Sequence, residues 1–129
     1  MGGQTKVQLE YLTTQALVPL IKQHNGVIIG LSAGAINMSK YSVIANPSHP
    51  PVSIHNGIGL VETTVVPHFG GISDEFIESM ILPMALNEPI YGLYDDAVIV
   101  NENETIKHSG TIYKLLNKNI ILLSYEDPL

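Results

Sequence analysis

The chain has 129 residues, enough for one domain with a buried core, and we expect a single domain over residues 1–129. Its formal net charge is −6, from 12 acidic residues against 6 lysines and no arginine, which argues against nucleic acid and anionic membrane surfaces as partners. The absence of cysteine excludes disulfides, thiolate metal sites and cysteine nucleophiles.

The first predicted element is a helix that runs from Thr5 to about Lys22. Thr5 as N-cap and Gln8 at the third helical position have the spacing of a capping box. Asn25 and Gly26 follow, and residues of these two types commonly end a helix.

A strand and a second helix are predicted to meet at Ser32. The apolar, β-branched run Val27–Leu31 indicates a strand that is covered on both faces, and a helix is expected over 33–41. The proline-rich residues 46–51 predict a loop, and 58–66 predicts another strand.

The second half is predicted to be rich in strands. Ser73 opens a helix whose predicted buried stripe is Phe76, Ile77, Met80, Ile81 and Met84. The strands expected after it are 90–93, 97–100, 105–108, 111–116 and 120–123, of which 97–100 and 105–108 form a hairpin. The alternation of strand and helix around Ser32 favours an α/β fold, a three-layer sandwich with a mostly parallel sheet.

Gly30-Leu31-Ser32-Ala33-Gly34 matches the G-x-S-x-G nucleophile elbow, in the context of a strand before and a helix after that this motif needs. The turn strains the serine backbone, which predicts that nothing bulkier than glycine fits at the flanking positions. The N–H of Ala33 is a candidate oxyanion donor. The same pattern also occurs by chance at close strand–helix contacts, so a purely structural serine is the alternative.

The best-placed general base among the five histidines is His68. It follows an apolar strand, at the edge where a parallel sheet exposes its carboxyl ends. His24 is expected to cap a helix, His49 and His55 to lie in a solvated loop, and His108 to lie on the surface. For the acid that orients the base, Asp95 and Asp96 follow the strand 90–93, although an ordinary acidic turn explains them as well.

Four motifs together resemble the peptidase E and cyanophycinase family of serine peptidases: Gly2-Gly3-Gln4-Thr5, Gly30–Ala35, Pro67-His68-Phe69 and Gly92–Asp96. The family's fold is similar to that of class I glutamine amidotransferases, so the resemblance implies a flavodoxin-like sandwich. It also implies Ser32 as nucleophile, His68 as general base, the N–H groups of Gly3 and Ala33 as oxyanion hole, and no metal or other cofactor. The implied reaction is hydrolysis of a small peptide through an acyl-enzyme.

The resemblance leaves the acid open. In the peptidase E branch it lies shortly after the serine, where this chain has Asn46 and Pro47. In the cyanophycinase-like branch it follows the histidine after another strand, which favours Asp95, with Asp96 second and Asn46 as a third orienting group. Peptidase E also binds an amino-terminal aspartate, which arginine helps to hold; this chain has no arginine, so a preference for aspartyl dipeptides is not expected unless Lys40 or a partner chain substitutes.

Family members carry several strands and helices before the G-G-x-T turn, whereas this chain starts at that turn. The resemblance therefore implies a domain that is incomplete at its amino-terminal side, with an exposed apolar sheet edge. The hydrophobic fraction of 45% and the mean hydropathy of +0.21 agree with such an edge. We expect a homo-oligomer, or a chain that another polypeptide completes.

The function expected from these observations is a serine peptidase acting on small peptides. The alternative is a catalytically silent structural or binding subunit that completes its fold with another chain. An esterase of the α/β-hydrolase kind is disfavoured, because that fold has the order serine-acid-histidine. No apolar run reaches the roughly 20 residues that span a bilayer and no signal peptide opens the chain, so a soluble, cytoplasmic protein is expected.

Overall fold

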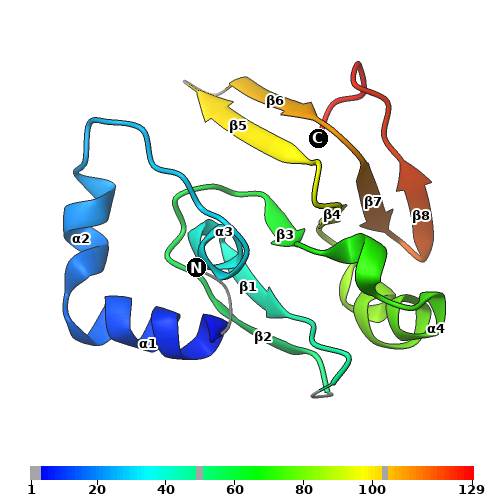
Figure 1. Ribbon diagram of the computed structural model, residues 1–129, viewed down its shortest axis with the longest axis horizontal. Coiled ribbons are helices and arrows are strands. Elements are labelled where there is room, and N and C mark those ends of the chain that lie inside the picture. Colours follow the sequence, from blue (N-terminus) through cyan, green and yellow to red (C-terminus); the bar gives the residue numbers. More distant parts are fainter. Residues whose placement is uncertain (1–3, 49–50, 103–104) are drawn as a thin grey trace.

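The fold is a mixed α/β arrangement, seen in a computed structural model that describes residues 4–48, 51–102 and 105–129. The helices are α1 (Thr5–Thr14), α2 (Leu17–Lys22), α3 (Ala33–Met38) and α4 (Asp74–Phe76). The strands are β1 (Tyr41–Ile44), β2 (Ser53–Asn56), β3 (Thr64–Val66), β4 (Ile90–Leu93), β5 (Val98–Glu102), β6 (Thr105–Ser109), β7 (Ile112–Leu116) and β8 (Asn119–Leu122). Figure 1 shows α1 and α2 on one side of the molecule and β4 to β8 on the other.

The described strands form one four-stranded sheet and two hairpins. The sheet has the order β3-β4-β7-β8, and the hairpins are β1-β2 and β5-β6. Only β3 and β4 pair in parallel, and the other strand pairs are antiparallel. The mostly parallel, flavodoxin-like sandwich is therefore not confirmed, whereas the α/β class and the β5-β6 hairpin are.

The strand predicted at Val27–Leu31 is wrong. These residues belong to no strand, and among the described residues no backbone hydrogen bond reaches residues 25–30. Val27 and Ile29 are 86% and 87% exposed. Apolar character alone does not make a strand, because the backbone groups also need a neighbouring strand to pair with, and no described strand pairs with this segment.

The core lies on the two faces of the β3–β4 pair. Successive side chains of a strand point to opposite faces, so Val66 and Ile90 join one cluster while Val65 and Tyr91 join the other. The first cluster consists of Val43, Val52, Val66, Phe69, Ile77, Ile81, Ala85, Ile90 and Leu115. The second consists of Val65, Tyr91, Leu93 and Ile112. The residues that follow β3 and β4 are thus anchored by buried strands.

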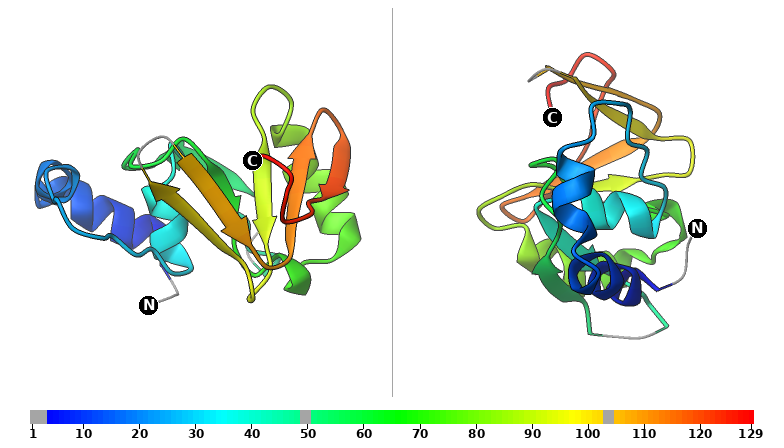
Figure 2. Two further views of the ribbon diagram at one scale, coloured as in Figure 1. Left: turned by 90° about the horizontal axis from the view of Figure 1, so that it is seen from above. Right: turned by 90° about the vertical axis from the view of Figure 1, so that its left-hand side faces the viewer.

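The amino-terminal helix differs from its prediction in two respects. It is broken at Ala16, whose φ of 54° is left-handed, and α2 continues in a new direction. Thr5 lies inside α1 rather than capping it, and the N-cap residue Gln4 makes no side-chain cap. Gln8 instead accepts a hydrogen bond from Asn37 Nδ2 at 2.9 Å. Figure 2 shows α1 and α2 projecting from the rest of the molecule, and neither helix has a buried residue.

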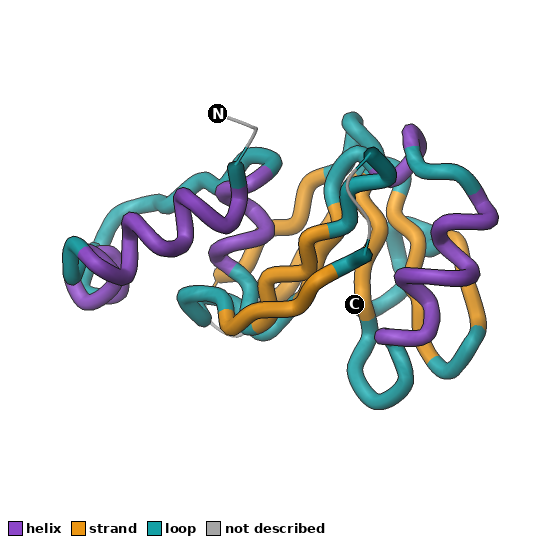
Figure 3. The backbone as a smooth tube through the Cα atoms, turned by 90° about the horizontal axis from the view of Figure 1, so that it is seen from below, coloured by secondary structure: helices purple, strands orange, loops and turns teal. Residues whose placement is uncertain are grey.

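The helix predicted at Ser73 begins there, since Ser73 Oγ accepts a hydrogen bond from the Phe76 N–H at 3.3 Å. After α4 the coil widens into a π-helical turn at Ile77–Ile81 and then tightens into a 3-10 turn at Leu82–Met84. Pro83 has no N–H to donate, so a regular α-helical ladder cannot continue through it. Figure 3 shows this helical segment beside the strands. Within the described residues no helix is long and apolar enough to cross a membrane.

Candidate active site

Ser32 occupies the strained turn that its motif predicts. Its φ is 51° and its ψ is −114°, a backbone conformation that residues other than glycine rarely adopt. The residue ends the extended segment 27–31 and precedes α3. A Cβ at Gly30 would lie 2.8 Å from Ala35 N, so glycine is required there. At Gly34 a Cβ would meet nothing within 4 Å, so the predicted requirement for glycine at that position is wrong.

His68 contacts the serine. Its Nε2 lies 3.0 Å from Ser32 Oγ, which is within the range for a general base and its nucleophile. His68 follows β3 and also has a left-handed backbone, with a φ of 58° and a ψ of 30°, at the start of a 3-10 turn over Phe69–Gly71. This backbone turns the imidazole back toward the amino end of α3.

Asp95 contacts the other side of the imidazole. Its Oδ1 lies 2.7 Å from His68 Nδ1. Because a carboxylate only accepts hydrogen bonds, the Nδ1–H donates to Asp95, and Nε2 is left to accept the proton of the Ser32 hydroxyl. The side chains of His68 and Asp95 are 63% and 81% exposed, so both groups are open to solvent.

The alternative acids have other partners. The carboxylate of Asp96 accepts hydrogen bonds from the backbone N–H and the hydroxyl of Thr111, at 3.2 and 3.1 Å. Asn46 Oδ1 accepts one from the Ser48 N–H at 2.9 Å. Asp96 therefore ties its turn to the residue before β7, and Asp95 is the acid that reaches the histidine.

Of the two predicted oxyanion donors, Ala33 and Gly3, the structure describes only Ala33. The N–H of Ala33 donates to no backbone carbonyl of the described residues, and it directly follows Ser32. Ala33 is 2% exposed, and its N–H is a candidate donor beside the Ser32 hydroxyl that lacks a backbone acceptor. Gly3 lies outside the described residues.

The other described histidines lie away from the serine. His24 is exposed, His55 Nε2 lies 3.2 Å from Ser53 Oγ, and His108 Nε2 lies 2.7 Å from the carbonyl oxygen of Asp127. His49 falls outside the described residues. Ser53 and His55 form a second serine–histidine pair, but both residues lie in the strand β2, and no carboxylate of the described residues contacts the imidazole of His55.

Two cavities flank the site. A cleft of about 480 Å³ includes His68, Tyr94 and Asp95 in its lining. A groove of about 380 Å³ lies on the other side, between the α1–α2 arm and the segment 27–31, with Leu12 and Ile28 among its residues. The first cleft includes the histidine and the acid in its lining, and neither of the two linings includes Ser32. No group of three or more histidine and carboxylate side chains arranged for a metal occurs among the described residues.

Lys40, the cation considered for binding a substrate carboxylate, is already paired. Its Nζ lies 3.1 Å from Glu88 Oε1 and 3.5 Å from Glu62 Oε2. The hydrogen bond that Lys40 donates to Glu88, followed by the negative charge of that carboxylate, raises the pKa of Lys40 above its usual value. Two neighbouring carboxylates thus neutralise this ammonium group.

One set of contacts was missed by the sequence reasoning. The ring of Phe69 lies on Gly92, and the ring of Tyr94 lies across Gly70, because a Cβ at either glycine would fall within 2.6 Å of a ring carbon. The available signal was Gly92 itself. A glycine in the middle of an apolar strand marks a place where another group approaches the backbone closely.

Comparison with known proteins places the chain in a family. The sequence model of Peptidase family S51 matches residues 1–109 and so includes Ser32, His68 and Asp95. No curated protein and no solved structure matches the chain. A match over so much of the sequence supports a peptidase or hydrolase, and it agrees with the resemblance to peptidase E. The chain belongs to peptidase family S51.

Proposed function

We propose that this protein is a serine-type peptidase that hydrolyses small peptides through an acyl-enzyme on Ser32. The observation that carries the proposal is the line of two hydrogen bonds from Ser32 Oγ through His68 to Asp95, at 3.0 and 2.7 Å. Membership of peptidase family S51 supports the same reaction class.

Acylation follows from this alignment. Ser32 Oγ attacks the carbonyl carbon of the peptide bond while His68 Nε2 takes the hydroxyl proton. The negative charge of Asp95 stabilises the imidazolium that forms. The carbonyl oxygen becomes an oxyanion, toward which the Ala33 N–H donates. When the tetrahedral intermediate collapses, the C–N bond breaks and His68 gives its proton to the leaving amine.

Deacylation repeats the sequence with water. A water molecule enters through the cleft, and His68 Nε2 removes its proton as the oxygen attacks the acyl carbon. Collapse of the second tetrahedral intermediate breaks the ester bond and returns the proton to Ser32 Oγ. The free carboxylate product leaves, and Ser32 and His68 recover their initial protonation states.

Labelling with a fluorophosphonate tests the nucleophile. The reagent should attach to Ser32, with the attachment site read by peptide mass spectrometry, and Ser32→Ala should abolish the label. Ser53→Ala is the matched control. Ser53 Oγ also lies 3.2 Å from a histidine, but Ser53 belongs to a strand, and within the part of the chain that the structure describes no carboxylate contacts that histidine. Ser53→Ala should label as the wild type does. A folded wild-type protein that takes up no label would refute the proposal and favour the catalytically silent subunit.

We propose that the substrates are small peptides recognised without a side-chain carboxylate. The chain has no arginine, and Lys40 is already paired with Glu62 and Glu88. A dipeptide with an amino-terminal aspartate should therefore be hydrolysed no faster than its alanine counterpart. A preference above about tenfold for the aspartyl substrate, equivalent to about 1.4 kcal/mol, contradicts this expectation.

We also propose that two copies of the chain associate through residues 25–31. Val27, Ile29 and Leu31 are 86%, 87% and 72% exposed, and the backbone groups of residues 25–30 have no backbone partner in the described part of the chain. Residues 23–39 include no Asp, Glu, Lys or Arg, so a second copy of the segment meets no like charge. An antiparallel pairing of two such segments satisfies their backbone groups and covers their apolar side chains.

Light scattering at micromolar concentration tests the association. The wild type should be a dimer, and Ile29→Lys should be a monomer because it puts a charge into the paired segment. Ile121→Lys is the control, since Ile121 is an exposed isoleucine of β8, an edge strand of the four-stranded sheet. A monomeric wild type contradicts the proposal, as does a dimer that only Ile121→Lys dissociates.

A further inference from the structure

The turn that carries His68 and the turn that carries Asp95 are joined at two points. They follow neighbouring parallel strands, and Val66 of β3 is paired with Gly92 of β4. The residues directly after His68 are Phe69 and Gly70, and each contacts a residue within three positions of Asp95. Both contacts consist of an aromatic ring placed against a glycine.

The buried point is Phe69 on Gly92. Phe69 is 4% exposed and belongs to the same core cluster as Val66 and Ile90. A Cβ on Gly92 would lie within 2.6 Å of the Phe69 ring carbons, so the ring occupies the space that a side chain at this position would fill. This contact fixes where the chain leaves β3.

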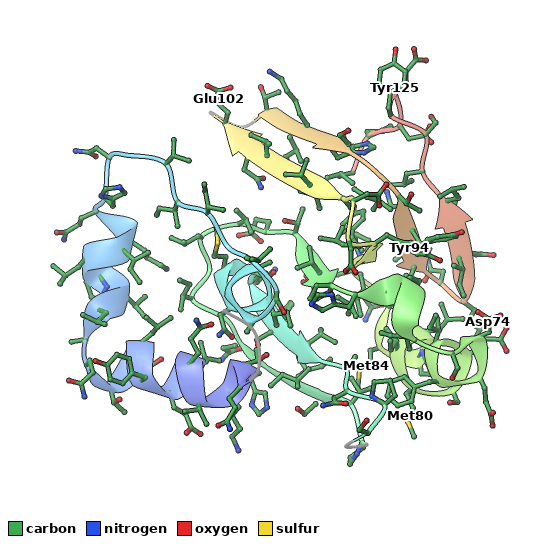
Figure 4. The ribbon with its side chains drawn as sticks, viewed as in Figure 1. Asp74, Met80, Met84, Tyr94, Glu102 and Tyr125 are labelled. Carbon is green, nitrogen blue, oxygen red and sulfur yellow. The ribbon has the colours of Figure 1, made fainter. Side chains whose placement is uncertain are left out.

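The exposed point is Tyr94 on Gly70. A Cβ on Gly70 would lie 2.6 to 3.1 Å from three carbons of the Tyr94 ring. Tyr94 is 36% exposed, and its ring centroid lies 5.7 Å from that of Tyr113 on β7. Tyr113 in turn lies 5.9 Å from Phe69, so one ring of β7 supports both contacts. Figure 4 labels Tyr94 in the right-hand part of the molecule, near β7.

The hydrogen bond between His68 and Asp95 needs such support. The side chains are 63% and 81% exposed, and pairs this open to solvent do little to hold their own geometry. In addition, His68 has a left-handed backbone that surrounding contacts must impose. In this turn Phe69 is held by burial, whereas Gly70 is exposed and is contacted by the ring of Tyr94.

We propose that Tyr94 is a positioning residue: its ring lies across Gly70 and holds the His68 turn in register with Asp95. The inference rests on the proposed function, because it assigns a role in the same reaction. It predicts that the Tyr94 ring acts on the rate of acylation rather than on binding. The nearest atoms to a Cβ on Gly70 are carbon atoms of the ring, whereas the phenol hydroxyl interacts with Tyr113.

Adjacent glycines provide the experiment. Gly70→Ala places a methyl group into the Tyr94 ring, whereas Gly71→Ala places one where nothing lies within 4 Å. Neither residue has a left-handed φ, so the two substitutions differ in this contact and not in backbone strain. Gly70→Ala should lower the maximal rate of fluorophosphonate labelling about tenfold or more, since displacements on the order of 1 Å can cost about a hundredfold. Gly71→Ala should stay within about twofold of the wild type.

Variants of the ring complete the test. Tyr94→Ala should slow labelling as Gly70→Ala does, with an unchanged half-saturating reagent concentration, and Tyr94→Phe should restore the wild-type rate. In Gly70→Ala/Tyr94→Ala the added methyl has no ring to displace, so the double variant should be no slower than Tyr94→Ala. Tyr125→Ala controls for loss of an exposed tyrosine, because Tyr125 is 79% exposed and lies far from Tyr94 in Figure 4.

A readout independent of activity separates this inference from the proposed function. The Nδ1 proton of His68, shared with Asp95, should give a low-field proton NMR resonance that is absent in His68→Gln. The resonance should weaken or disappear in Gly70→Ala and Tyr94→Ala and persist in Gly71→Ala and Tyr94→Phe. Persistence of the resonance and of the labelling rate in Tyr94→Ala would overturn the positioning role. If the wild type takes up no label, and the resonance is nevertheless lost in Tyr94→Ala, the peptidase proposal fails while the positioning role of Tyr94 is supported.

Discussion

Replacement of Asn37 by alanine tests what attaches the amino-terminal helix to the rest of the molecule. Asn37 is 1% exposed, and its Nδ2 donates to the Thr5 carbonyl at 3.0 Å and to Gln8 Oε1 at 2.9 Å. Its Oδ1 accepts from the hydroxyl of Ser42 at 3.1 Å. Since α1 has no buried residue of its own, the hydrogen bonds of this amide link α1 to α3 and β1 in the described part of the chain.

The cost can be worked out bond by bond. Three hydrogen bonds at about 1 kcal/mol each give about 3 kcal/mol, and the Ser42 hydroxyl, which is fully buried, loses its acceptor at a further cost of about 1–3 kcal/mol. Because such terms overlap, we expect Asn37→Ala to lower the free energy of unfolding by about 3–5 kcal/mol. That is a large part of the stability of a domain of this size.

Urea denaturation measures this change, and amide hydrogen exchange locates it. Residues 5–14 should exchange much faster in Asn37→Ala, while β4 and β7 change less, because only α1 depends on the amide. Asn56→Ala is the control, since Asn56 is exposed on β2 and its loss should cost no more than about 0.5 kcal/mol. A loss below about 1 kcal/mol for Asn37→Ala, or unchanged exchange in α1, would refute the reasoning.

Three further outcomes are expected. Asp95→Asn should lower the labelling rate by about three to four orders of magnitude and Asp96→Asn by less than about tenfold, and the reverse ranking would make Asp96 the orienting acid. The hydrogen bond to Glu88 raises the pKa of Lys40 above 10.5, so the ion pair stabilises the fold fully below that pH, and this contribution is lost as the pH rises through the pKa of the folded protein. In urea denaturation, Lys40→Met should therefore have a lower free energy of unfolding than the wild type at pH 8 and the same one in strong alkali. Gly34→Ala should raise the free energy of unfolding by about 0.5–1 kcal/mol without loss of labelling, and destabilisation would mean that the turn does need glycine there.

Local patterns predicted much of the second half of the molecule and the elements around the site. β4 was predicted with the bounds that it has, because its apolar run is buried on both faces and ends at a turn. The Ser73 cap and the β5-β6 hairpin were predicted because they depend on neighbours in the sequence. The candidate nucleophile, base and acid were chosen by the same reasoning, since each follows an apolar run.

What the sequence could not predict depends on contacts between distant segments. The run Val27–Leu31 has the composition of a buried strand, but its structure is decided by whether another strand pairs with it. Thr5 and Gln8 have the spacing of a capping box, but the side chain of Gln8 instead accepts a hydrogen bond from Asn37, which lies far along the chain. The requirement for glycine at Gly30 and not at Gly34 follows from the position of the α3 backbone, which no local pattern reveals.

The hydrogen bonds of Thr111 connect the candidate site to residues that follow the part of the chain matched by the family model. Ser32, His68 and Asp95 all lie within residues 1–109, which match the family. The carbonyl of Thr111 nevertheless accepts from the Tyr94 N–H at 3.1 Å, its own N–H and hydroxyl donate to Asp96, and Tyr113 supports the Tyr94 ring. The three candidate catalytic side chains thus lie in one stretch of sequence, and part of the contacts that hold Asp95 lie in the stretch that follows. A chain ended at residue 109 would retain the three candidate side chains and lose the β7 contacts on both sides of Asp95.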